Sequence, residues 1–149
     1  MWFNEPPDRR IISWRDWRNN LSNLEPNSIV EQVCKDWSRV PTVLHYLAPD
    51  QLHDWPNPWE LVYNNIYCDL AICLGMTYTF CLMDHDEFND VELQIYRTDN
   101  GWSNLSSINQ GKYVLNYHYG RVVNSQYVSK DKMKLAYSYS KIDLLDKFS

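Results

Sequence analysis

The chain has 149 residues, of which 44% are hydrophobic and 22% charged, and it carries a formal net charge of −5. This length and apolar content predict one domain, residues 1–149, with a packed core, and they exclude a disordered chain. The charge is uneven, because residues 51–100 hold nine acidic side chains against one basic, whereas residues 101–149 hold seven basic against three acidic. Sequence-independent binding of nucleic acid requires a basic surface, so nucleic acid is not expected as a partner.

Four cysteines, at positions 34, 68, 73 and 81, form no Cys-x-x-Cys pair. Three of them lie in one apolar stretch, which is typical of reduced thiols packed in a core. We infer a reducing, cytoplasmic compartment. The N-terminal residues contain no apolar segment of the kind found in secretion signals, so no such signal is expected. The apolar stretch spans about 16 residues, too short to cross a bilayer, so no membrane association is expected.

Residues 1–12 contain Pro6 and Pro7 and are expected to form an extended arm. Trp2 and Phe3 at its tip are costly to expose, so they are expected either to fold back on the domain or to dock on a partner. The chain as a whole has seven Trp and eleven Tyr, a load that suits contact surfaces as well as a core. A protein partner or self-association is therefore expected.

Helical spacing of apolar residues predicts a helix over 14–24, with Trp14 and Trp17 on one stripe. This stripe either packs into the core, which the spacing favours, or joins the arm in an interaction surface. Pro26 is expected to end this helix. A capping-box pattern then predicts a second helix over 29–39.

Pro41 is expected to open a helical turn over 42–47, and residues 48–58 are expected to form an ordered loop. Asn57 precedes Pro58, and Glu60 follows three residues after Asn57, which is the pattern of a capped helix start.

The central stretch is the strongest helical signal in the chain. A short helix is predicted from Pro58 to Asn64, followed by a kink because Asn tolerates the left-handed conformation. A second helix is predicted over 67–82. Nearly every residue after Asp69 in that helix is apolar, which indicates that it is buried on most sides.

After Leu82 the apolar residues alternate, as they do in half-buried strands. The predicted strands cover 91–96, 102–108, 112–124 and 133–142. Gly120 within the third predicts a bend, and residues 143–149 are expected to form a tail. Helices followed by strands predict an α+β fold, in which the central helix packs on an antiparallel meander of three to four strands.

The acidic loop over 84–90 does not match a calcium-binding loop, because Phe88 occupies a ligand position and no Gly supplies the sharp turn. No phosphate-binding Gly-rich loop is present. No metal and no cofactor are therefore expected.

Cys68 stands at the predicted start of the buried helix, where free backbone amides and the helix dipole favour a thiolate. The segment 67–71, Tyr-Cys-Asp-Leu-Ala, resembles the nucleophile segment of the transglutaminase-like branch of the papain-like cysteine enzymes. The segment 101–105, Gly-Trp-Ser-Asn-Leu, is similar to a Gly-Trp segment of that family. The resemblance covers roughly residues 60–125.

The resemblance implies a Cys-His-Asp triad, with the Cys opening a central helix and the His and Asp on following strands. The chain departs from this pattern, because its first strand begins without a His and Ser106 occupies the place of the Asp. Within this resemblance, His118 is the candidate base, and Asp131 or Asn124 is the candidate residue to orient it.

Because the catalytic set is incomplete, the leading hypothesis from the sequence is a non-catalytic structural or protein-interaction component. Its aromatic-rich style is similar to that of bacteriophage virion or accessory proteins, which would place it in a virion. The alternative is a cysteine-dependent acyltransferase or peptidase of transglutaminase-like type. A third hypothesis is an acidic inhibitor or nucleic-acid mimic that presents residues 84–92.

Overall fold

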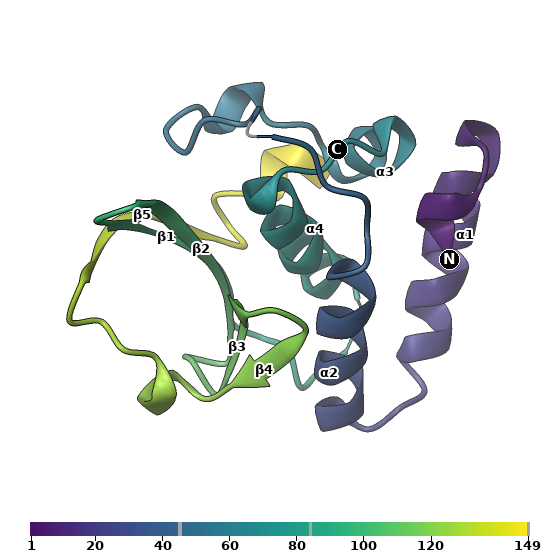
Figure 1. Ribbon diagram of the computed structural model, residues 1–149. Helices are drawn as coiled ribbons and strands as arrows, with labels where there is room; N and C mark the ends of the chain where they lie inside the picture. The colour runs from purple at the N-terminus through teal and green to yellow at the C-terminus, as the bar shows by residue number, and fades with distance from the viewer. Residues whose placement is uncertain (45, 84, 149) are drawn as a thin grey trace.

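The computed structural model describes residues 1–44, 46–83 and 85–148 and has an α+β fold, as the sequence predicts. The helices come first in the chain and the strands last (Figure 1). The main elements are α1 (Pro7–Leu21), α2 (Pro26–Trp37), α3 (Pro58–Asn64), α4 (Asp69–Leu82), β1 (Val91–Thr98), β2 (Gly101–Ile108), β3 (Tyr113–His118), β4 (Arg121–Val123) and β5 (Met133–Ser140).

The strands form one antiparallel sheet in the order β4-β3-β2-β1-β5. The first four strands follow one another as a meander. The long run predicted over 112–124 divides into β3 and β4, because Gly120 turns the chain with a φ of 67°. β5 then returns to the far edge and pairs with β1, which the sequence does not predict.

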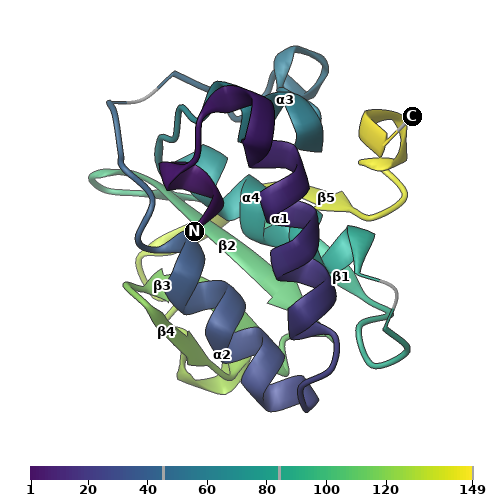
Figure 2. The ribbon, with the colours of Figure 1, turned by 90° about the vertical axis from the view of Figure 1, so that its right-hand side faces the viewer.

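The helices α2 and α4 pack on one face of the sheet. α1 lies outside them and away from the sheet, as Figures 1 and 2 show from two sides. Helix α4 therefore lies in the middle of the molecule, with every residue from Leu70 to Cys81 buried. The sequence predicts this position, because a helix that is apolar all round must be covered all round.

The start of α3 is formed as predicted. The Glu60 amide donates to Asn57 Oδ1 over 2.8 Å, and the Asn57 amide donates to Glu60 Oε1 over 3.0 Å. Asn65 ends α3 in the left-handed conformation, with a φ of 57°. The chain thus breaks between α3 and α4 at the pair of asparagines, which is what sets the start of α4.

The N-terminal residues are not an extended arm. Trp2–Asn4 form a 3-10 turn, and Pro7 opens α1. Proline is favoured at the first position of a helix because its missing N–H is not needed there. The same reason explains why Pro26 begins α2, although the sequence analysis expects it only to end the preceding helix.

The four aromatic residues expected at an interaction surface belong to the fold itself. Trp2 and Trp14 are 0% exposed, and Phe3 packs against the core. The ring of Trp2 lies 4.6 Å from that of Trp17, whose Nε1 donates to Asp36 Oδ2 over 2.8 Å. Trp2 and Trp14 therefore cover the helical core and have no exposed surface for a partner, whereas an interaction role for the partly exposed Phe3 and Trp17 stays a prediction.

Two further segments differ from expectation. Thr42 forms a parallel bridge with Tyr67 instead of opening a helical turn; His45 of that segment lies outside the described residues. The expected tail folds back, since Leu144 is buried and Lys147 Nζ donates to the Trp55 carbonyl over 2.7 Å. Among the described residues, no helix combines the length and apolar content needed to cross a membrane.

The contact between Gly75 and Trp37 yields a prediction about stability. A Cβ at Gly75 would lie 2.3 Å from Cη2 of Trp37, so Gly75→Ala should lower the free energy of unfolding by about 1–3 kcal/mol through overpacking. Trp37→Phe removes the atoms that clash. In urea denaturation, the cost of Gly75→Ala should be smaller in the Trp37→Phe background; an equal cost in both backgrounds would contradict the prediction.

Candidate functional site

The Cys68 thiol lies at the N-terminal end of α4. Cys68 is the N-cap residue of this helix, is 2% exposed, and lines a cleft of about 500 Å³. The cleft is formed by the segment before α3, the start of α4 and the β1–β2 hairpin. Its lining residues are Val43, Leu44, Pro49, Cys68, Asp69, Leu70, Asn100, Gly101, Trp102 and Asn104.

A network of polar side chains converges on Asp69, the residue after the cysteine. Asn104 Nδ2 on β2 donates to Asp69 Oδ2 over 2.8 Å. Asn116 Nδ2 on β3 lies 3.3 Å from Asp69 Oδ1 and donates to the Asn104 carbonyl over 2.8 Å. The start of α4 is thereby tied to two strands of the sheet.

Two details of this network are unusual. Asn116 has a φ of 71°, a left-handed conformation that is rare and strained within a strand for a residue with a side chain. Asn104 Oδ1 is buried and has no hydrogen-bond partner among the described residues. Strained backbone residues gather at functional sites, so the conformation of Asn116 points to this end of the sheet.

The start of α4 carries no side-chain cap from Cys68. The first amides of a helix have no acceptor within it, so the Asp69, Leu70 and Ala71 amides are oriented to favour negative charge beside the thiol. Tyr46 lies near Cys68 and is not a base for it, since burial, with a smaller effect of Cys68, raises the pKa of Tyr46 to about 12.

The other three thiols have different surroundings. Burial raises the pKa of Cys34 and of Cys73, and it raises that of Cys81 to about 12. A thiol with a raised pKa is mostly protonated at neutral pH and therefore a poor nucleophile. Cys34, Cys73 and Cys81 thus serve as packing residues, which the apolar helix predicts for Cys73 and Cys81 but not for Cys34 of α2.

The structure places the predicted partners of Cys68 elsewhere. His118 ends β3, is exposed, and pairs across the hairpin with Arg121. Asp131 is exposed in the turn before β5, and Asn124 caps a 3-10 turn by accepting from the Gln126 amide over 3.0 Å. None of the three lines the cleft at Cys68. Their catalytic roles stay predictions.

Two other histidines are described. His53 lies 3.3 Å from Asp54 on an exposed turn, and His85 Nδ1 accepts from the Glu87 amide over 3.2 Å. Neither lines the Cys68 cleft. Among residues 1–44, 46–83 and 85–148, the polar groups that do surround Cys68 are therefore carboxylate and amide groups, not imidazoles.

Asn104 and Asn116 are the residues that sequence reasoning missed. Asn104 lies in the Gly-Trp segment that carries the family resemblance, yet no pattern marks it as a neighbour of Asp69. The polarity of Asn104 is the signal that could have indicated it, because an Asn on the inner face of a predicted strand needs a hydrogen-bond partner. Only the packing of α4 on the sheet supplies that partner.

No protein-family model matches the chain, and no curated protein matches it. The fold is similar to that of a solved structure, LapG of Legionella pneumophila in its calcium-bound form, a transglutaminase-like cysteine protease. The TM-score is 0.68 at 11% sequence identity, over 91% of this chain and 77% of that one. At this identity the likeness shows a shared fold and no more.

This likeness contradicts the leading hypothesis from the sequence, a non-catalytic structural or interaction component, and favours the cysteine-enzyme alternative. It supports no viral or virion role. Nor does the structure present residues 84–92 as a continuous acidic surface, because Phe88 is buried against Phe80 and Val91 lies in the core; Asp84 is outside the described residues.

The Asn116 backbone yields a prediction that separates conformation from side-chain bonding. Asn116→Gly keeps the left-handed conformation and loses the amide, so it should lower the free energy of unfolding by about 1 kcal/mol. Asn116→Ala should cost about 1 kcal/mol more, because Ala is strained at this φ. Urea denaturation of both variants measures the difference; equal stabilities would contradict strain at this position.

The residue before Cys68 yields a prediction about alkaline pH. Burial raises the pKa of Tyr67 from 10.0 to about 12, so the protonated phenol favours the folded state below pH 10.0, and this stability is lost as pH rises toward about 12. Tyr67→Phe should flatten the fall in unfolding free energy over this window. Tyr127→Phe, at an exposed site, is the control. Parallel curves for Tyr67→Phe and the parent would refute the prediction.

Proposed function

We propose that this protein is a cysteine-dependent acyltransferase or peptidase of transglutaminase-like type, with Cys68 as its nucleophile. The observation that carries the proposal is the position of the Cys68 thiol, which opens the buried helix α4 and lines an open cleft. The likeness in fold to a cysteine protease supports it. The other three cysteines lack both features.

The chemistry follows from the thiol and the uncapped helix start. The Cys68 thiolate attacks the carbonyl carbon of an amide, so that an S–C bond forms while the C–N bond breaks. The amine leaves with the proton that the thiol gave up. Water or a second amine then attacks the thioester carbonyl, so that a C–O or C–N bond forms, the S–C bond breaks, and the sulfur regains a proton from the attacking group. The free amides at the start of α4 favour the negative charge of the thiolate and of the developing oxyanion.

The walls of the cleft indicate the kind of acyl donor. Leu44 is 91% exposed at its rim, and Val43 and Trp102 line it as well. Solvent-exposed apolar side chains beside a nucleophile suit an apolar segment of substrate. The polar groups on the other side, Asn104 among them, can accept or donate hydrogen bonds to a peptide backbone. A peptide or protein substrate is the partner that this cleft fits.

The residue that accepts the thiol proton is to be identified by experiment. His118 is the candidate from the family resemblance, although it does not line the cleft.

The similar structure is calcium-bound, but we assign no calcium ion to this chain. Among the described residues, no group of three or more His, Cys, Asp or Glu side chains could hold a metal. We therefore derive no step through a metal ion.

The compartment and further partners stay predictions. All four cysteines are unpaired, which is compatible with a reducing, cytoplasmic compartment. Self-association is not supported through Trp2 or Trp14, because both are enclosed by the fold.

Alkylation tests the nucleophile without knowledge of the substrate. Iodoacetamide at neutral pH, followed by peptide mass mapping, should modify Cys68 at least about ten times faster than Cys34, Cys73 or Cys81, because only thiolates react. Cys68→Ser should remove the fast phase and leave the slow one unchanged. If Cys68 reacts no faster than the other three, the proposed function is wrong.

The same reaction identifies the base. Each histidine (45, 53, 85 and 118) is replaced by Gln in turn, and the alkylation rate of Cys68 is followed with pH. The variant that loses its base should react more slowly at neutral pH, and its rate should approach that of the parent as the solution is made more alkaline, because hydroxide then replaces the missing base. If no variant changes the profile, none of the histidines, His118 included, is the base.

A further inference from the structure

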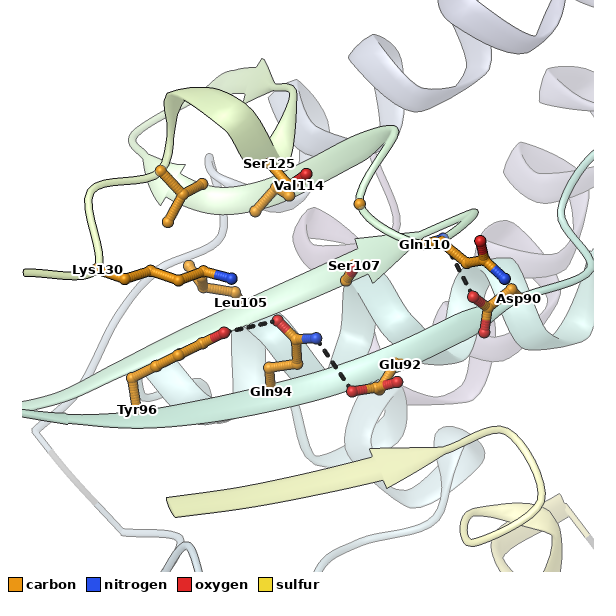
Figure 3. A pocket seen from close by; sticks show the side chains of 12 residues that line it. Asp90, Glu92, Gln94, Tyr96, Leu105, Ser107, Gln110, Val114, Ser125 and Lys130 are labelled. Carbon is orange, nitrogen blue, oxygen red and sulfur yellow. Dashed lines mark hydrogen bonds between the residues drawn. The ribbon is translucent and has the colours of Figure 1, made fainter. Parts of the chain in front are cut away.

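A second cleft, of about 290 Å³, lies on the face of the sheet opposite α4 (Figure 3). It is enclosed between β1, β2 and β3 on one side and the segment that leads from β4 to β5 on the other. Its lining residues are Asp90, Glu92, Gln94, Tyr96, Leu105, Ser107, Gln110, Gly111, Val114, Ser125, Val128 and Lys130. It shares no lining residue with the cleft at Cys68.

Strand alternation determines which side chains face this cleft. Ser106 points to the helical side, where it accepts a hydrogen bond from Thr77 Oγ1 over 3.0 Å. The neighbouring Ser107 must therefore point to the other face. Ser107 lines the cleft at 6% exposure and adds a hydroxyl to its floor.

One end of the cleft is acidic. Glu92 Oε1 accepts from Gln94 Nε2 over 3.0 Å and also from the Ser138 hydroxyl. Asp90 Oδ2 accepts from the Gln110 amide over 3.1 Å. The second oxygen of each carboxylate accepts no hydrogen bond from the described residues. This end can therefore bind a cationic group, and an ammonium has the donors that two carboxylates accept.

The rest of the cleft has different chemistry. Leu105, Val114 and Val128 form an apolar cluster with Tyr96, whose hydroxyl donates to Gln94 Oε1 over 3.2 Å. Figure 3 shows the Lys130 side chain extending into the cleft from the facing segment. Its Nζ lies 5.9 Å from the Tyr96 ring centroid. Lys130 thus supplies a positive charge beside an apolar surface.

We propose that this cleft binds a small zwitterion of the α-amino acid class with an apolar side chain. The ammonium group pairs with Asp90 and Glu92, and the carboxylate pairs with Lys130. The apolar side chain lies against Leu105 and its neighbours. The volume of about 290 Å³ is at the lower end of ligand pockets, which suits a ligand of this size.

The test uses the whole chain and ligand-detected NMR with a panel of free valine, leucine, methionine and phenylalanine. At least one should bind saturably below about 10 mM. Two analogues of leucine, isoamylamine without the carboxylate and 4-methylpentanoate without the amine, should each bind at least about tenfold more weakly, because each loses a charge-assisted contact. Binding should not depend on Cys68, so Cys68→Ser leaves it unchanged.

Two pairs of variants locate the site. Glu92→Gln and Lys130→Gln should each weaken amino-acid binding at least about tenfold. The control variants Glu87→Gln and Lys132→Gln alter exposed charges outside the cleft and should leave amino-acid binding unchanged. Thermal unfolding shows whether each variant is folded.

Three outcomes would overturn the proposal: no saturable binding by any amino acid of the panel, equal binding of the analogues, or binding that survives both substitutions in the cleft. Because the ligand and the residues differ from those of the Cys68 cleft, failure here leaves the proposed enzyme untouched. Likewise, failure of the proposed enzyme would leave the proposed amino-acid site untouched.

Discussion

The structure depends on the burial of one helix that is apolar on every side. From Leu70 to Cys81, α4 exposes almost nothing, and it must be covered by both halves of the chain. On the helical side, the Trp37 ring lies on Gly75 and its Nε1 donates to Thr79 Oγ1 over 2.9 Å. On the sheet side, Thr77 binds Ser106. Burial of apolar surface drives this packing, and the hydroxyl contacts fix its register.

The position of α4 against the sheet determines where Cys68 and Asp69 lie. Because the helix packs mainly on β1 and β2, its first residues lie beside Asn104 of β2 and Asn116 of β3, whose side-chain amides donate to Asp69. Cys68 is thereby placed at a helix start and at the edge of a cleft at once. The opposite face of the same sheet carries a second polar cleft, because alternate residues of β1 and β2 point away from α4.

The hypothesis of a non-catalytic component failed for a physical reason. It took the Trp-rich N-terminus as a surface for contact, but a Trp ring is equally suited to a core, and composition does not distinguish the two uses. In the fold, Trp2 packs against Trp17 and Trp37. The prolines misled in a similar way, since Pro7 starts a helix where an extended arm was expected, and Pro26 starts a helix where only the end of the preceding one was expected. The likeness to a cysteine protease at 11% identity is carried by the arrangement of elements, not by the residues.

What the sequence determined by itself is local. The capping box at Asn57, the break at Asn65 and the buried helix follow from patterns within a few residues, and each is present in the structure. The tertiary structure alone decided the return of β5 to the far edge, the approach of Asn116 to Asp69, and the exposed position of His118. These depend on contacts between residues distant in the chain, and no short pattern encodes which strand will lie beside which.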